Sequence, residues 1–265
     1  MTTRSWDSPD SGYAELLARF EELRSNTALI APHLEYVARN LRPRVDLVAS
    51  ERFLETGASR FGGLPDLPRS AEWPMYDAGP YRFLGQVNLA DGIARNDVLP
   101  VSGLLSFFAA DDEDQSVDYR DERFVRVIYS AAGTVLEPRA APSGALTVGQ
   151  QPVDLRVGID LPHSDSQLTD WPDEKLARVL DRWLEQAVDV PSGRLGYLLG
   201  YPPASTLGYD PTPSPGWTPL LTLYSSHGES KHLQLFWHDG DPLHVFVPTR
   251  KLLDLDFGEI RCDAG

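Results

Sequence analysis

Five polar side chains are candidates for recognition chemistry, because each lies among apolar residues or in a turn-rich loop: Gln86, Asn88, Arg126, Tyr201 and Asp239. Gln86 and Asn88 are two residues apart in a strand-like run and therefore share one face of the strand. Two amides there could bind a peptide or a sugar. The simpler interpretation is that they satisfy the backbone of the loop at residues 62–68, since buried polar groups need partners.

The other three candidates also have a structural and a functional interpretation. Arg126 is the one cation of the apolar stretch 125–129, so its guanidinium could anchor a carboxylate of a ligand or pair with a nearby acid, and we favour the pairing. Tyr201 adjoins a Pro-rich segment that could line a groove or pack as an ordinary loop. Asp239 begins an Asp-Gly pair, which is a hairpin turn signal.

The sequence contains no signature of a common enzyme class. Searches for a Gly-x-Ser-x-Gly elbow, a His-Glu-x-x-His helix, a Walker phosphate loop and a Gly-x-Gly-x-x-Gly turn find nothing. We therefore predict no catalytic residue and no cofactor. A triad recognised only by its geometry would not be found in this way.

Two groups of residues could in principle hold a metal ion. His232, His238 and His244 are spaced by six residues, and an acidic run extends from Asp111 to Glu122. The histidines lack a zinc-site pattern and are typical of strand surfaces. The acidic run has serine where a calcium loop of the EF-hand type needs glycine, and is interpreted as a solvated loop. We predict no metal site.

The composition restricts the partners that the protein can have. The 265 residues include 39 acids and 24 bases, a net charge of -15, which disfavours nucleic acid and anionic membranes and favours a basic protein partner. One cysteine, Cys262, allows no intrachain disulfide. The N-terminus has no apolar leader and no run is long enough to span a bilayer. A cytoplasmic location is expected.

Periodicity and turn residues predict an α+β fold. Apolar positions at helical spacing predict helices over residues 11–24, 32–43 and 172–188. Aromatic and β-branched runs between turn formers predict strands over residues 44–48, 81–89, 103–109, 123–130, 220–225, 232–237 and 243–247. The strands should form an antiparallel sheet, with the first two helices before it.

A weak internal repeat runs through the chain. Pro65 precedes Gln86 by 21 residues, and Pro202 precedes Thr222 by 20, each pair linking a Gly-Pro loop to a strand. We interpret this spacing as a duplication, although two similar loops could also arise independently. The predicted organisation is a helical lead-in over residues 1–43 and one domain over 44–265, with repeats at about 44–150 and 151–265.

At these positions the chain resembles the YwqG-like family, a bacterial domain of unknown function. The resemblance depends on runs spread over most of the chain: Gly-Gly-Leu-Pro-Asp-Leu-Pro at 62–68, Phe-Leu-Gly-Gln-Val-Asn-Leu at 83–89, Leu-Leu-Gly-Tyr-Pro at 198–202 and Trp-His-Asp-Gly-Asp at 237–241. It implies a mixed α and β fold of two intertwined repeats, and the helix predicted at 172–188 would lie between them. The chain departs from the family in carrying Thr222, Tyr224, Ser225 and Ser226 where glutamine and acids are usual.

These observations lead to three functional hypotheses. The first is a non-enzymatic binding protein, of a regulatory or immunity type, that engages a basic protein partner. The second is a hydrolase or other small-molecule enzyme with its site between the two repeats. The third is a structural subunit of a larger assembly, which would require a broad exposed apolar patch.

Overall fold

The computed structural model describes residues 31–92, 98–110, 117–162, 191–226 and 233–265. Its main element is a ten-stranded antiparallel sheet in the order β14-β13-β12-β11-β1-β10-β2-β6-β7-β8. The strands are β1 (Arg42–Ala49), β2 (Arg60–Phe61), β6 (Arg82–Asn88), β7 (Leu104–Ala109), β8 (Val125–Ser130), β10 (Gln151–Asp160), β11 (Arg194–Leu199), β12 (Trp217–Leu223), β13 (Leu243–Pro248) and β14 (Arg261–Ala264).

Smaller elements complete the described part of the chain. Two ribbons pair β3 (Asp66–Pro68) with β9 (Leu136–Pro138), and β4 (Met75–Tyr76) with β5 (Gly79–Pro80). The helices are α2 (Leu34–Asn40) and α4 (Thr249–Leu253), with two single 3₁₀ turns, η1 (Ala31–His33) and η2 (Leu89–Asp91). No helix within these described ranges is both long and apolar enough to cross a lipid bilayer.

The predicted α+β class is wrong. The regular secondary structure of the described residues is nearly all antiparallel sheet, and α2 and α4 are only seven and five residues long. The chain leaves α2 at Leu41 with an extended backbone, and β1 begins at the next residue, Arg42. Pro43 disfavours helical geometry in Arg42, so the helix cannot continue past this point. The helices predicted at residues 11–24 and 172–188 lie outside the described residues.

The strand predictions also need correction. Four strands of the main sheet, β2, β10, β11 and β14, were not predicted. In β10, Val153, Leu155, Val157 and Ile159 alternate with more polar residues, as in a half-buried strand. The described part of the strand predicted at 232–237 is irregular instead. Its backbone is held by serine hydroxyls: Ser226 Oγ accepts from the Leu235 N–H at 3.0 Å.

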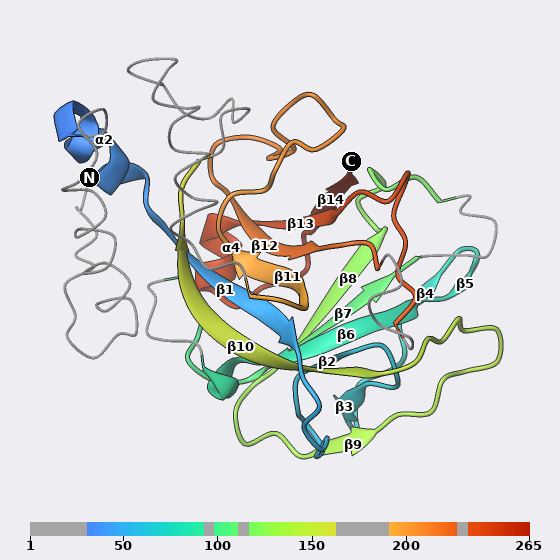
Figure 1. Cartoon of the computed structure of the whole chain (residues 1–265). Coiled ribbons are helices and arrows are strands. Elements are labelled where there is room, and N and C mark those ends of the chain that lie inside the picture. Colours follow the sequence, from blue (N-terminus) through green and yellow to red (C-terminus); the bar gives the residue numbers. More distant parts are fainter. Residues whose placement is uncertain (1–30, 93–97, 111–116, 163–190, 227–232) are drawn as a thin grey trace.

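The centre of the sheet is an exchange of strands between the two halves of the chain. In the chain, β1 comes directly before β2 and the strands β6 to β8, but it pairs with β11. Conversely, β10 comes directly before β11 and the strands β12 to β14, but it pairs with β2. β1 and β10 pair with each other over eight residues. Figure 1 shows them as two long strands side by side. In the order of the sheet, β11 to β14 follow on the side of β1, and β2, β6, β7 and β8 follow on the side of β10.

The two outer parts of the sheet match in register. They are called the first wing (β2, β6, β7 and β8) and the second wing (β11, β12, β13 and β14) below. In the first, Arg60, Gln86 and Ser106 are successive cross-strand partners on β2, β6 and β7. In the second, the corresponding positions on β11, β12 and β13 are Tyr197, Thr222 and His244. Each wing also skips one residue at the same place, Leu84 in β6 and Leu220 in β12. Matched bulges support the duplication that the spacing predicts, since bulges persist within families.

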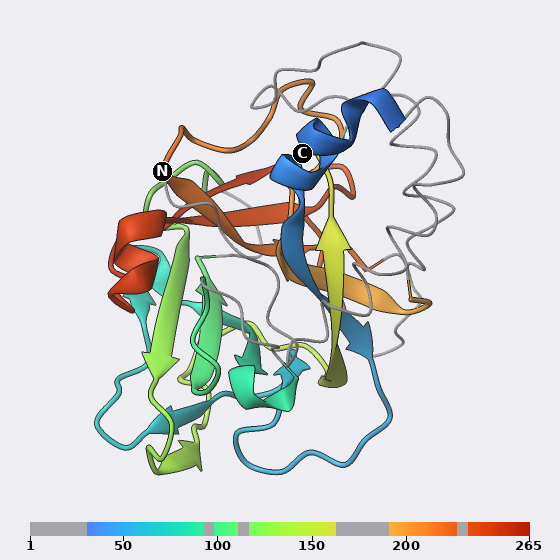
Figure 2. The same cartoon turned by 90° about the vertical axis from the view of Figure 1, so that its left-hand side faces the viewer.

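One apolar core lies inside this curled sheet. Its fully buried members come from both wings and from the exchanged strands: Val45, Leu47, Phe61, Phe107, Val153, Leu198, Leu221 and Val245. Two contacts show that the end strands of the sheet approach each other. Arg261 Nη2 on β14 lies 2.7 Å from Oε1 of Glu122, just before β8, and the ring centroids of Tyr129 and Phe257 are 5.9 Å apart. Figure 2 shows the two wings folded toward each other.

Two strand glycines allow a test of how tightly the sheet is packed. A Cβ on Gly196 would lie 2.2 Å from the Thr222 carbonyl oxygen, whereas one on Gly158 would come no closer than 3.6 Å to any neighbour. Gly196→Ala should therefore lower the free energy of unfolding by about 1–3 kcal/mol or more. Gly158→Ala should change it by less than about 1 kcal/mol, measured by urea denaturation. Equal effects in the two variants would contradict the described β11–β12 packing.

Candidate functional site

The candidate site is an open groove of about 320 Å³ against the first wing of the sheet. It is lined by residues 54–56 and 63–64, with Arg60, Asp66, Pro138 and Gln150, and is called the loop groove below. Its walls are the loop between β1 and β2, the corner that follows β2, and the end of β9. Strand pairing of β3 with β9 brings the last two walls together.

A buried carboxylate forms the floor of the loop groove. Three donors converge on a single oxygen, Asp66 Oδ2: the Gly57 N–H at 2.7 Å, Arg60 Nη1 at 2.9 Å and Gln86 Nε2 at 2.9 Å. Burial alone would raise the pKa of Asp66, but the hydrogen bonds from Arg60, Gly57 and Gln86 outweigh it and hold the pKa below its ordinary value. Asp66 is therefore ionised at neutral pH.

Arg60 fixes the corner that follows β2. Its Nε donates to the Leu64 carbonyl at 3.2 Å, and its Nη2 donates to the same oxygen. The chain can turn so sharply because Gly62 and Gly63 both have positive φ angles, 67° and 71°, which side chains other than glycine rarely adopt. The guanidinium is thus used within the wall of the groove.

Gln86 and Asn88, both predicted as binding residues, hold the same loops. Gln86 Oε1 accepts from the Asp66 N–H at 2.9 Å, and Asn88 Nδ2 donates to the Gly57 carbonyl at 3.0 Å. Neither residue lines the loop groove. These contacts agree with the simpler interpretation, in which the amides satisfy loop backbone, and they make the groove walls rigid.

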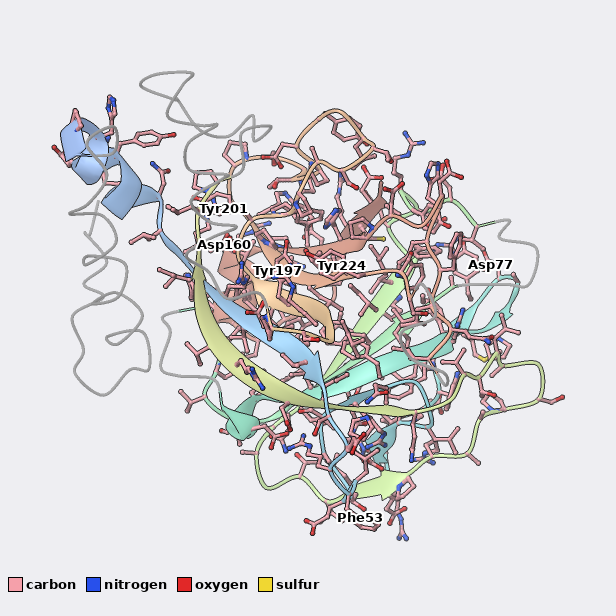
Figure 3. The ribbon with its side chains drawn as sticks, viewed as in Figure 1. Phe53, Asp77, Asp160, Tyr197, Tyr201 and Tyr224 are labelled. Carbon is pink, nitrogen blue, oxygen red and sulfur yellow. The ribbon has the colours of Figure 1, made fainter. Side chains whose placement is uncertain are left out.

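Exposed apolar side chains lie in, or next in sequence to, the segments that line the loop groove, and they are called the apolar border below. Leu64, in the lining, is 39% exposed, and Phe53, next to the lining residue Leu54, is 89% exposed. Val135, which precedes β9, is 77% exposed. Figure 3 shows Phe53 projecting from the end of the molecule where β3 and β9 lie. Large apolar groups exposed together around a concavity are typical of interaction surfaces.

A buried cluster of charges lies where β1, β10 and β11 meet. It is formed by Arg44, Asp46, Asp160, Arg194, Tyr197 and Tyr224 and is called the ion network below. Arg44 lies between two acids, with Nε 3.0 Å from Asp46 Oδ1 and Nη1 3.2 Å from Asp160 Oδ1. Arg194 pairs with Asp46 at 3.3 Å. The cluster therefore balances two bases with two acids, as buried charges must.

The tyrosines of this region pack against the charges. Arg194 Nη2 donates to the Tyr224 hydroxyl at 3.0 Å, and its guanidinium lies over the Tyr197 ring at 5.4 Å. Burial raises the pKa of both tyrosines, and raises that of the neighbouring Tyr201 to about 12. All three phenols therefore keep their protons at physiological pH. Figure 3 shows the three with Asp160 in one region of the molecule.

The remaining predicted site residues lie apart from the loop groove. Tyr201 is buried, donates its N–H to Asp160 Oδ2 at 2.9 Å and its hydroxyl to the Asn40 carbonyl at 2.8 Å. Arg126 lies on the end strand β8, and its guanidinium opposes the rise that burial causes in the pKa of Tyr81. Asp239 is 89% exposed in the turn after Trp237. The structure brings together only Gln86 and Asn88.

The groups considered for metal binding are separated or outside the described residues. Among the described residues no three histidine, cysteine, aspartate or glutamate side chains cluster as metal ligands. His232 and residues 111–116 lie outside that part of the chain. His244 is buried with Nδ1 3.2 Å from Thr222 Oγ1, whereas His238 lies half exposed beside Asp241.

Sequence reasoning missed the charged residues that matter most, although a signal for them exists. Arg44 and Asp46 alternate with valine and leucine in β1, so the strand has one polar and one apolar face. Both are buried, which requires a second layer over the polar face. Asp66 was noted only as part of a turn-rich run, since no local pattern shows that three donors from distant segments converge on it.

Comparison with protein families identifies one match. The sequence matches the family described as a domain of unknown function, DUF1963, over residues 59–264. The match covers most of the chain, which therefore belongs to this family. No curated protein matches the sequence. The matched region begins after β1, although β1 is a central strand of the sheet.

The floor of the loop groove gives a pH-dependent prediction. Because the folded-state pKa of Asp66 lies below its ordinary value of 3.8, its ionisation stabilises the fold above that value, and this stabilisation is lost as pH falls through the folded-state pKa. Asp66→Asn should therefore be less stable than the natural protein at about pH 6, with a difference that shrinks toward about pH 3. Urea denaturation across this range measures it; a constant difference would contradict the assignment.

The ion network gives a second prediction. Arg44→Met leaves Asp160 buried without its base and should cost about 3–5 kcal/mol of unfolding free energy at pH 7. The cost should be smaller at about pH 4.5, because an uncompensated buried carboxylate takes up a proton more readily. Arg156→Met is the matched control, since Arg156 lies opposite Asp46 on β10 but is exposed. Similar losses in both variants would show that the network is not stabilising.

Proposed function

We propose that this member of the DUF1963 family is a non-enzymatic binding protein that engages a basic protein partner through the loop groove. The observation that carries the proposal is the combination of an open concavity, walls held by buried hydrogen bonds, and an exposed apolar border. Interfaces place their strongest contacts where apolar groups enter such pockets. Rigid walls reduce the entropy lost on binding, so that more of the contact energy contributes to affinity.

The charge of the protein supports a basic partner. A net charge of -15 attracts cationic proteins over distances of about a Debye length and raises their association rate. The lining of the groove also favours a basic partner. Arg60 is the only base among the described lining residues, and its charge is balanced by its ion pair with Asp66. Glu55 is the remaining charged residue of the described lining, so the lining has a net negative charge.

The alternative of a small-molecule enzyme receives less support. A second cavity of about 180 Å³ lies beside Gly200, with Arg42, Trp217, Thr218 and Thr249 in its lining. The two threonine hydroxyls bond to each other at 2.8 Å, and no histidine or carboxylate is found among its described lining residues. A hydrolase site needs a base close to a nucleophile, so the binding function is preferred.

Two finer assignments belong to the same proposal. Within the DUF1963 family we assign the chain to the YwqG-like proteins, on the runs at residues 62–68, 83–89 and 198–202. We also assign it to the cytoplasm, where the thiol of its single cysteine, Cys262, would stay reduced. A regulatory or immunity role is the expected setting for such a binding protein.

Peptide display tests the proposed function. A random peptide library is panned against the natural protein, and the enriched peptides are measured against a double variant, Phe53→Ser with Leu64→Ser, in which two exposed apolar contacts are lost. Affinity should fall by about tenfold or more, the loss typical of a central apolar contact. Leu253→Ser, which removes an exposed apolar side chain from α4, is the control and should leave affinity unchanged. Failure to enrich any peptide that depends on Phe53 and Leu64 would contradict the proposal.

A further inference from the structure

We infer that the loop groove receives one lysine or arginine side chain of its partner, with the cationic head against Asp66 and Glu55 and the flanking residues on the apolar border. The inference rests on the proposed function and makes it more specific, because it names the side chain that anchors the partner. It follows from three features of the groove: an oxygen available at the floor, an acid at the mouth, and apolar walls between them.

The floor offers an acceptor that the fold does not use. All three hydrogen bonds to Asp66 go to Oδ2, and no described residue donates to Oδ1. A carboxylate has about four acceptor sites, so Oδ1 retains its full capacity. The side chain of Asp66 is only 2% exposed, yet the residue lines the groove. A carboxylate oxygen so placed is complementary to a hydrogen-bond donor, and most of all to a cationic one.

Arg60 does not fill this role itself. Its Nη1 is shared between Asp66 Oδ2 and the Ala58 carbonyl, and its Nε and Nη2 point to the Leu64 carbonyl. The guanidinium neutralises one carboxylate charge in the floor. Glu55, exposed in the lining, adds a negative charge at the mouth, and none of the described residues forms an ion pair with it.

The walls suit the stem of a basic side chain. Leu54, Leu64 and Pro138 contribute carbon surface to the lining and come from three separate segments of the chain. Lysine and arginine carry three or four methylene groups that pack on apolar surface while the head reaches a polar partner. The volume of about 320 Å³ is at the small end of ligand pockets, which suits one side chain better than a folded element. An acidic or phosphorylated segment would instead meet the charges of Glu55 and Asp66.

Four synthetic peptides test the inference. Acetylated and amidated heptapeptides Gly-Ser-Leu-X-Leu-Ser-Gly carry lysine, arginine, norleucine or glutamate at X, and fluorescence anisotropy gives their affinities at low and high salt. The lysine and arginine peptides should bind about tenfold or more tightly than the norleucine peptide, which has a similar stem without the charge. Raising the salt concentration should narrow this difference.

Variants locate the charge that matters. Glu55→Gln should reduce the preference for lysine over norleucine several-fold, whereas Glu51→Gln, an exposed acid in the same loop outside the lining, should not. Thr56→Arg, which places a cation in the groove, should weaken the basic peptides most. A carbodiimide should also couple the peptide lysine to Glu55, and mass spectrometry would locate the new amide bond.

The outcomes separate the inference from the function on which it rests. A norleucine peptide that binds as tightly as the lysine peptide, or enriched display peptides that depend on Phe53 and Leu64 but lack basic residues, would overturn the inference and leave the binding function intact. Failure of every peptide, including those from the display experiment, to bind at the groove would overturn both. Preference for lysine that persists in Glu55→Gln and Thr56→Arg would place the cation elsewhere and also overturn the inference.

Discussion

The pairing of β1 with β10 is the interaction on which the whole structure depends. β1 also pairs with β11 of the second wing, and β10 also pairs with β2 of the first wing. Neither wing therefore has a complete sheet without this exchange of strands. Val45, Leu47 and Val153 place their side chains in the shared core. The fold is therefore one cooperative unit. Its physical boundary lies before residue 42, whereas the family match begins only at residue 59, after β1.

A common scaffold supports different chemistry in the two wings. Arg60 and Gln86 in the first wing correspond to Tyr197 and Thr222 in the second. In the first, arginine and amide groups bridge to a loop carboxylate and hold an open groove. In the second wing, the Tyr197 phenol and the Thr222 hydroxyl form no such bridge to a loop carboxylate of the described residues. Charged side chains from β1, β10 and β11 occupy the corresponding face of the sheet instead. The cost of burying these charges is offset only because they are paired.

Local patterns in the sequence explain some of this structure and leave out the rest. Turn residues and β-branched runs located β6, β7, β8 and β13 to within about two residues, since those signals are local, whereas the strand predicted at 220–225 overlaps β12 only over 220–223. No strand was predicted at β2, β10, β11 or β14, although β10 and β11 are the two partners of β1. Gln86 was selected as a polar residue in an apolar run, but its bond to the Asp66 backbone joins segments 20 residues apart. No local pattern encodes that contact, or the identity of Asp66 as its centre.

The way in which polar groups are used favours the proposed binding function over catalysis. A catalytic group must change its protonation or its partners during a reaction, and so it needs capacity that the fold leaves open. Here the phenols of Tyr197 and Tyr224 are held neutral, and Arg44 and Arg60 are committed to buried pairs. What the first wing leaves available is one oxygen of a fixed carboxylate, in a groove lined by both polar and apolar side chains. Under the proposed function, such a surface would select a partner by charge and shape without altering it.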